Sequence, residues 1–307
     1  MKDISIIIPH KNIPQLLERC INSIPVTSNM EVIIIDDNSD ETIVDFNNFP
    51  GRTRSDTKII LTKEGKGAGY ARNIGLKEAK GKWILFADAD DFFLPNSFGI
   101  ISEYLNSDYD IIFFNAITRM SDHLDVVSHR MDRYLEKIRN HDEIFARYNS
   151  NTSVLKLFKH QFIISYDIKF EEIQLSNDIY FSCVAGINAK KIIVDDRELM
   201  CITQRNDSLV FHTHTKEERI IRFNSYMRCN ALLNSIGKWR YCHNALMIYL
   251  GDCNKFSDCL NIKYLFVFFY YTGFKSIIFI FWALRGIIRV LLVKISAQFN
   301  FSVAYHR

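Results

Sequence analysis

The chain has 307 residues, with 38 Lys and Arg against 35 Asp and Glu and a formal charge of +3. Acidic and basic residues are mixed throughout, which argues against a nucleic-acid-binding stripe and an acidic disordered tail. The seven cysteines are scattered and none forms a Cys-x-x-Cys pair, so a reduced, cytoplasmic protein is favoured over a zinc protein. The first apolar run, residues 4–8, is too short for a signal peptide, so we do not expect secretion.

Residues 1 to about 115 alternate short apolar runs with amphipathic stretches. The runs at residues 4–8, 32–35, 58–61, 83–87 and 111–114 are apolar on both faces, which predicts buried parallel strands. Helical patterns lie between them, at residues 14–24, 42–47, 71–79 and 95–106. This alternation predicts an α/β fold with a doubly wound, mostly parallel sheet.

The later part of the chain is less regular. Residues 190–194 have the composition of another strand, and a final short strand precedes Arg205. From about residue 215 to 260 the pattern is helical. No internal repeat and no low-complexity linker divides the sequence.

The residues that follow the predicted strands are the first candidates for a site, because ligands of such sheets bind beyond the carboxyl ends of the strands. They are residues 9–12 after the first strand, Asp36 and Asp37 after the second, and Asp88, Asp90 and Asp91 after the fourth. One explanation is a pair of solvated turns, since Asp is common in turns. Two acidic clusters at one sheet edge instead favour a shared ligand, and carboxylates suit Mg²⁺ or Mn²⁺ that bridges to phosphates.

Three alternate glycines, Gly65, Gly67 and Gly69, stand between the third strand and the third helix. Such a backbone can approach a ligand closely, and a helix N-terminus suits an anion. Tyr70 stands where a dinucleotide fingerprint needs its third glycine, and the Lys-Ser/Thr ending of a P-loop is missing. A flexible connection without a ligand is the alternative.

Four ordered motifs resemble family 2 glycosyltransferases of the GT-A fold, inverting bacterial enzymes that build capsular, exopolysaccharide and lipopolysaccharide glycans. The motifs are residues 8–12 (IPHKN), 35–40 (IDDNSD), 69–75 (GYARNIG) and 86–91 (FADADD). The resemblance covers about residues 3–210. We therefore expect a GT-A domain at residues 1–210, a helical extension at 211–262 and an apolar, basic segment at 263–307.

The resemblance implies a role for each matching residue. Pro9, Asn12, Asp36, Asp37, Gly69, Arg72, Asp88 and Arg205 would bind the nucleotide-sugar, and Asp90 would bind the metal together with Asp88. Within that set, Asp37 would hydrogen-bond the base, with Asp36 supporting it. Asp91 would cap the following loop. Arg205 and Ser208 would close over the diphosphate.

The catalytic base of the family belongs to an acidic pair, commonly Glu-Asp. Asn177-Asp178 stands at that position, so Asp178 is the implied base. Its place at a helix start also fits a solvated capping residue, and Glu171 and Glu172 are competing bases. Val154 replaces a Trp that is frequent in the family. The resemblance also implies that His212 or His214 completes the metal shell. The alternative is that both are exposed loop histidines.

The C-terminal segment carries apolar runs at residues 264–271 and 277–284, and basic residues that include Arg285 and Arg289. Neither run reaches the roughly 20 residues that a span needs. A basic, apolar helix suits the surface of an anionic membrane. The alternatives are a buried helix or oligomer contact, and a true span. We expect the protein at the cytoplasmic face of the inner membrane.

The resemblance thus implies an inverting glycosyltransferase that moves a hexosyl or N-acetylhexosaminyl group. The donor would be a nucleotide-diphospho-sugar, most simply a UDP-sugar, and the acceptor a hydroxyl of a cell-surface glycan or a lipid-linked acceptor. Mn²⁺ or Mg²⁺ would be the cofactor, and no nucleic acid would take part. The alternatives are an inactive, membrane-attached binding subunit and a sugar nucleotidyltransferase.

Overall fold

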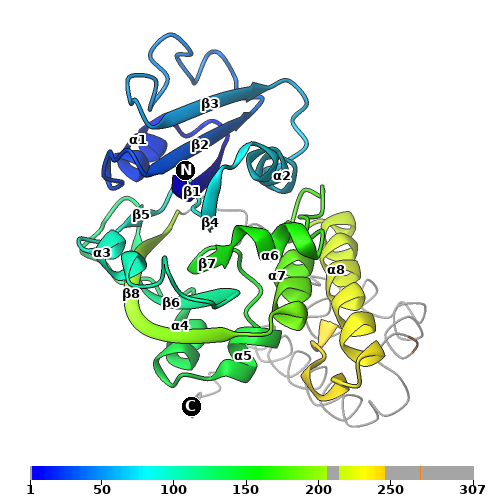
Figure 1. The fold of residues 1–307 in the computed structure, drawn as a ribbon. Coiled ribbons are helices and arrows are strands. Elements are labelled where there is room, and N and C mark those ends of the chain that lie inside the picture. The colour runs from blue at the N-terminus through cyan, green and yellow to red at the C-terminus, as the bar shows by residue number, and fades with distance from the viewer. Residues whose placement is uncertain (1, 206–213, 246–269, 271–307) are drawn as a thin grey trace. The chain divides into compact units, whose positions relative to one another are not determined.

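The computed structural model describes residues 2–205, 214–245 and 270. The chain separates into two compact units, Met1–His212 and Thr213–Arg307. The described part of the first unit is built around one mixed sheet with helices packed against it (Figure 1).

The sheet has the strand order β3-β2-β1-β4-β7-β6-β8-β5. Its strands are β1 (Lys2–His10), β2 (Met30–Asp37), β3 (Thr57–Thr62), β4 (Gly81–Phe86), β5 (Phe92–Phe93), β6 (Ile111–Met120), β7 (Lys156–Lys159) and β8 (Ile192–Gln204). Strands β1 to β4 are parallel, as are β6 and β8, whereas β7 and β5 run antiparallel to their neighbours. The predicted α/β fold with a mostly parallel sheet is confirmed.

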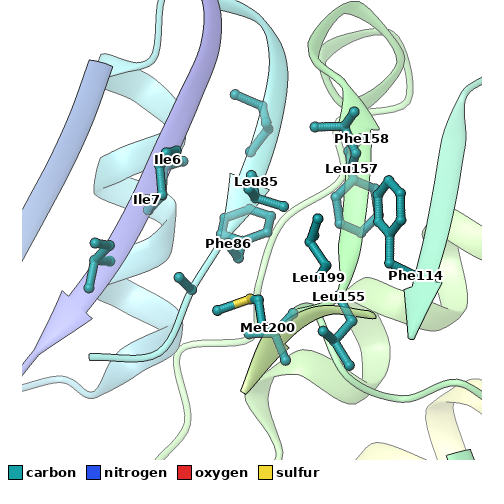
Figure 2. Close-up of a cluster of buried hydrophobic side chains, with 14 of the residues drawn as sticks. Ile6, Ile7, Leu85, Phe86, Phe114, Leu155, Leu157, Phe158, Leu199 and Met200 are labelled. Atoms are coloured by element: carbon teal, nitrogen blue, oxygen red, sulfur yellow. The ribbon is translucent and has the colours of Figure 1, made fainter. Parts of the chain in front are cut away.

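The central strands form because their side chains are buried on both faces of the sheet. Ile6 and Ile7 of β1 are fully buried, as are Leu85 and Phe86 of β4, and Phe86 contacts the ring of Phe158 on β7 (Figure 2). β-Branched and aromatic residues suit such a doubly covered sheet. The resulting core holds the carboxyl ends of β1, β2 and β4 at one edge.

Seven helices of the described chain belong to the first unit. They are α1 (Pro14–Asn22), α2 (Ala68–Glu78), α3 (Ser97–Ser102), α4 (Asp132–Arg139), α5 (Glu143–Tyr148), α6 (His160–Ser165) and α7 (Asn177–Asn188). Helix α1 begins at Pro14 and buries Leu17, Cys20 and Ile21 at helical spacing. Helix α2 packs on β1 and β2, and α6 packs on β4 and β7.

The helix predicted at residues 42–47 is wrong, because that stretch forms turns. The side chain of Asp40 accepts from the Thr42 amide at 2.8 Å, and that of Asp45 accepts from the Asn47 amide at 2.9 Å. Such local bonds compete with the hydrogen bonds of a helix. The strand predicted at residues 190–194 and the one before Arg205 are instead a single long strand, β8.

The described part of the second unit contains α8 (Lys216–Ser235) and the short 3₁₀ helix η1 (Trp239–Tyr241), in agreement with the predicted helical pattern. Helix α8 begins with a capping box between Thr215 and Glu218. Across the residues that the structure describes, no helix combines the length and apolarity needed to cross a membrane. The expected interfacial segment, residues 263–307, lies outside the described residues apart from Tyr270.

Candidate active site

The carboxyl edge of the sheet opens into a cavity of about 530 Å³. Its lining includes most of the residues that the sequence singled out: Pro9, Asn12, Asp37, Arg72, Asp88, Asp90, Asp178 and Arg205. Asp36 and Gly69 are not among the lining residues. The fold therefore brings the strand-end motifs, the start of α2 and the start of α7 to one place.

Asp36 supports the cavity from behind. His10 Nδ1 lies 2.7 Å from Asp36 Oδ2, and the Ile13 amide donates to His10 Nε2, so the ring proton sits on Nδ1 and is donated to Asp36. Ser39 Oγ also donates to this carboxylate and accepts from the Asn12 amide. Burial alone would raise the pKa of Asp36, but the hydrogen bonds from His10 and Ser39 outweigh it and lower the pKa. The ionised Asp36 thus fixes the loops after β1 and β2.

Asp37 faces the glycine-rich loop. Its two carboxylate oxygens accept from the amides of Lys66 at 3.1 Å and Gly67 at 2.7 Å. Gly67 has a φ of 96°, which favours glycine at this turn. An ionised carboxylate has about four acceptor positions, so Asp37 keeps capacity for a ligand. Its predicted bond to a nucleotide base stays a prediction.

Gly69 serves packing. A Cβ at this residue would collide with the carbonyl oxygen of Glu171 and with the Cβ of Asn177. The missing side chain lets α2 begin directly beside the loop that precedes α7. A contact between Gly69 and the donor stays a prediction.

Arg72 connects three parts of the site. Its Nη2 donates to Asp88 Oδ1 at 2.5 Å and its Nη1 donates to Asn177 Oδ1 at 2.8 Å. The guanidinium also lies over the ring of Phe170, 5.3 Å from its centroid. Asn177 stands where the family commonly has Glu, and here its neutral amide oxygen accepts from the buried Arg72.

The carboxylates after β4 form a cluster. The side-chain oxygens of Asp88, Asp90 and Asp91 lie within 4.8 Å of one another. Burial and then the charge of Asp88 raise the pKa of Asp90, and burial with the charges of both neighbours raises that of Asp91 well above its usual range. Hard oxygen ligands that repel one another in this way fit Mg²⁺ or Mn²⁺.

Asp91 accepts at Oδ1 from the Thr203 amide at 2.7 Å and is 3% exposed. It was expected to cap the following loop, but its partner is on β8. Asp91 therefore ties the end of β4 to β8, and the less buried Asp88 and Asp90 stay the predicted metal ligands.

Two arginines face the cluster. Arg205 Nε lies 3.2 Å from Asp90 Oδ2. Arg130 lines the cavity, donates to the Thr203 carbonyl at 2.9 Å and lowers the pKa of Asp90 by its charge. The sequence does not single out Arg130, because it lies in a stretch of mixed polar and charged residues that belongs to no motif.

Asp178 stands in the first turn of α7 and lines the cavity. Burial raises its pKa, and the charge of Asp88 adds to this, while that of Arg72 opposes it. The competing bases Glu171 and Glu172 are not among the lining residues. Val154 is buried and does not line the cavity either. His214 belongs to the second unit, and Ser208 and His212 lie outside the described residues.

Solved structures show the class of fold. The crystal structure of residues 1–349 of Staphylococcus aureus TarS in complex with UDP-GlcNAc superposes with a TM-score of 0.66 at 20% identity, over 88% of this chain and 79% of that one. The mannosyltransferase PcManGT from Pyrobaculum calidifontis, in complex with GDP-Man and Mn²⁺, gives a TM-score of 0.56 at 12% identity, over 97% and 88%. The sheet is thus that of the GT-A fold.

The family follows from the sequence comparison. Residues 5–172, more than half of the chain, match the family described as Glycosyl transferase family 2. The chain belongs to this family, as its motifs indicated.

Curated relatives are similar over part of their length. The Staphylococcus aureus poly(ribitol-phosphate) beta-N-acetylglucosaminyltransferase TarS is 26% identical over 217 residues, 67% of this chain and 36% of TarS. The Escherichia coli UDP-Glc:alpha-D-GlcNAc-diphosphoundecaprenol beta-1,3-glucosyltransferase WfgD is 34% identical over 117 residues, 36% of this chain and 45% of WfgD. The chain spans less than half the length of each relative.

Proposed function

We propose that this protein is a metal-dependent, inverting glycosyltransferase that moves a sugar from a UDP-sugar to a hydroxyl of a cell-surface glycan or a lipid-linked acceptor. The observation that carries this proposal is the single cavity that Asp88, Asp90 and Asp178 line together. The family membership supports sugar transfer. The names of TarS and WfgD and the UDP-GlcNAc bound to TarS support a UDP-sugar donor.

Departure of the diphosphate is the first chemical demand. Mn²⁺ or Mg²⁺ held by Asp88 and Asp90 would supply Lewis-acid stabilisation of the charge on the leaving diphosphate. Arg205 contributes a second cation on the same side, next to Asp90. Arg72 keeps Asp88 oriented through their hydrogen bond. Asn12 and Asp37, which line the same cavity, would bind the nucleoside half of the donor.

Activation of the acceptor is the second demand. Asp178 accepts the proton of the acceptor hydroxyl as that oxygen attacks the anomeric carbon. Its raised pKa brings it closer to the working pH and so makes it a stronger base than an ordinary carboxylate. Attack from the face opposite the leaving diphosphate inverts the anomeric carbon, as with the single base of inverting hydrolases.

The protein is proposed to act at the cytoplasmic face of the inner membrane. The basic, apolar residues 263–307 would provide peripheral contact with anionic lipid and bring the cavity to its acceptor. The inactive binding subunit is disfavoured because Asp88, Asp90 and Asp178 are all present. The nucleotidyltransferase is disfavoured because residues 9–12 are not a Gly-rich, basic loop and because of the family match.

A nucleotide-sugar panel tests the proposal. Purified full-length protein is incubated with UDP-GlcNAc, UDP-Glc, GDP-Man and other donors, with Mn²⁺, Mg²⁺ or EDTA, and release of free nucleotide is measured. We expect hydrolysis of a UDP-sugar that requires metal and stops in EDTA. Binding of UDP without turnover of any donor would instead indicate the inactive binding subunit.

A further inference from the structure

The main-chain carbonyl of Asp90 is held by two side chains from distant parts of the chain. Arg19 Nη2 of α1 donates to this oxygen at 2.6 Å, and Thr203 Oγ1 of β8 donates to it at 2.7 Å. Neither residue lines the cavity. Thr203 also donates its amide to Asp91 Oδ1. Two side chains outside the cavity lining therefore hold the peptide of the proposed metal ligand.

Asp90 needs such support because it lies in a turn after β4 rather than in a strand or helix. The Asp91 amide closes this turn by donating to the Asp88 carbonyl at 3.0 Å. No regular ladder fixes the Asp90–Asp91 peptide plane, so its orientation is set by the bond from the Asp91 amide and by the two bonds to the Asp90 carbonyl. The direction of a short side chain such as Asp follows directly from its backbone.

The other contacts of Arg19 are with neutral groups and an aromatic ring. Its other donors reach Ser121, whose carbonyl and hydroxyl lie 3.3 Å from Nη1 and Nη2, and its guanidinium lies over Phe92 at 5.2 Å. Within the described residues, no carboxylate lies within ion-pair distance of Arg19. Burying a guanidinium that bonds only neutral partners costs free energy. We therefore expect this position of Arg19 to serve a function.

The charge of Arg19 lies close to the cluster. Cys20, its neighbour in α1, is affected by the charge of Arg19 and by those of Asp88, Asp90 and Asp91; burial and then these three carboxylates raise the pKa of its thiol, while Arg19 opposes them. Arg19 therefore contacts Asp90 at its main-chain carbonyl, whereas Arg205 pairs with the Asp90 side chain.

We propose that Arg19, together with Thr203, is a positioning residue for the divalent cation: the two side chains hold the Asp90 carbonyl so that the Asp90 carboxylate faces the metal. This inference rests on the proposed function. Groups that orient a metal ligand contribute about 10- to 100-fold in metal affinity or activity. Because Arg19 acts through the backbone, we expect the lower end of that range.

The test compares three variants with a matched control. Arg19→Met removes the bonds and keeps the length, Arg19→Lys keeps one donor, and Thr203→Val removes the second bond while keeping the bond from its amide to Asp91. The control is Arg54→Met, because Arg54 also donates to main-chain carbonyls, those of Ile21 in the last turn of α1 and of Ile24 just after it. This control separates loss of an arginine anchor from loss of metal orientation.

Mn²⁺ binding to the full-length protein in the presence of UDP is measured by electron paramagnetic resonance, alongside thermal unfolding and the Mn²⁺ dependence of turnover. We expect Arg19→Met to raise the Kd for Mn²⁺ about tenfold, with Arg19→Lys and Thr203→Val in between. Arg54→Met is expected to lower the unfolding temperature and leave the Kd for Mn²⁺ within about twofold.

If Arg19→Met does not fold, Thr203→Val decides, since the valine is nearly the same size and loses only the hydroxyl. Wild-type Kd values in all three variants, or an equal rise in Arg54→Met, would overturn the positioning role alone. A wild-type protein that fails to bind Mn²⁺ with UDP would overturn the metal-dependent function and this role with it.

Discussion

Arg205 Nε and Asp90 Oδ2 lie 3.2 Å apart in the cavity, so the residue implied to grip the diphosphate is paired with the carboxylate implied to hold the metal. Both side chains are mostly buried, with exposed fractions of 24% and 20%, so separating them costs free energy unless other charges replace the pair. A donor diphosphate and a cation would supply those replacement charges. In the free protein the charges of these two side chains thus compensate one another.

This pairing predicts opposite effects of Arg205→Met on the two ligands. The KM for the donor rises about tenfold or more, since a charge-assisted bond to phosphate is lost. Mn²⁺ binding without donor does not weaken, because Asp90 loses a competing cation. Isothermal titration with Mn²⁺ and donor kinetics check the two effects. Arg119→Met, on β6, is the control and is expected to change neither.

Asp178→Asn is expected to lower kcat by about a thousandfold, within the usual contribution of a general base. The Kd for UDP stays near the wild-type value, because Asp178 acts on the acceptor. Glu171→Gln, which alters the rival base, is expected to keep near wild-type turnover. Near wild-type kcat for Asp178→Asn, or a large loss for Glu171→Gln, would show that Asp178 is not the base.

Asp178→Asn is also expected not to lower the unfolding temperature at about pH 8. The pKa of Asp178 is raised in the folded protein, so its ionised form destabilises the fold above that pKa. The neutral Asn removes this cost, and the advantage disappears as the pH falls towards the ordinary carboxyl value. Thermal unfolding at about pH 8 and about pH 4 measures the difference.

The raised pKa of Asp178 also predicts an acid limb in the pH dependence of kcat/KM. Activity falls as the pH drops through a pKa above the usual carboxyl value of 3.8, since the base is then protonated. The charge of Lys156 lowers the pKa of Asp178, so Lys156→Met moves the limb to higher pH. Lys159→Met, at the other end of β7, leaves it in place. A limb that shifts equally in both variants would contradict the assignment.

Strands β1, β2 and β4 could be predicted because each is apolar on both faces, a pattern that a buried parallel strand produces directly. Strand β3 has the same apolar pattern, but it is an edge strand on which Leu61 is exposed. Strand β7 was not predicted, since it is only four residues long and has Lys156 and Lys159 at its ends. Its antiparallel insertion between β4 and β6 depends on tertiary pairing, which periodicity does not report.

The residues of the site can likewise be separated into those that the sequence predicts and those that it does not. The carboxylates after β2 and β4 follow from the topology rule for sheet edges, which needs only the strand assignments. Asp178 stands at the start of a helix far along the chain, and the resemblance alone singled it out. Arg130, Arg19 and Thr203 belong to no motif, and their contacts arise only when α1, the turn after β4, the segment before α4 and β8 are folded together.

Lys156 offers a last prediction, on stability. It is 2% exposed, its Nζ donates to the Ser150 carbonyl at 2.8 Å and lies over the ring of Phe113, and burial lowers its pKa from 10.5 to about 7. Between those two pH values the unfolded chain binds a proton at this lysine that the folded chain does not. The free energy of unfolding therefore rises with pH over this window.

In Lys156→Met this contribution to the pH dependence is removed. The variant is expected to gain stability relative to wild type near neutral pH and to lose that gain, by a few kcal/mol, as the pH approaches about 10. Urea unfolding of both proteins across this range measures the difference, with Lys159→Met as the control. A difference between Lys156→Met and wild type that is constant across the range would show that Lys156 stays charged in the folded protein.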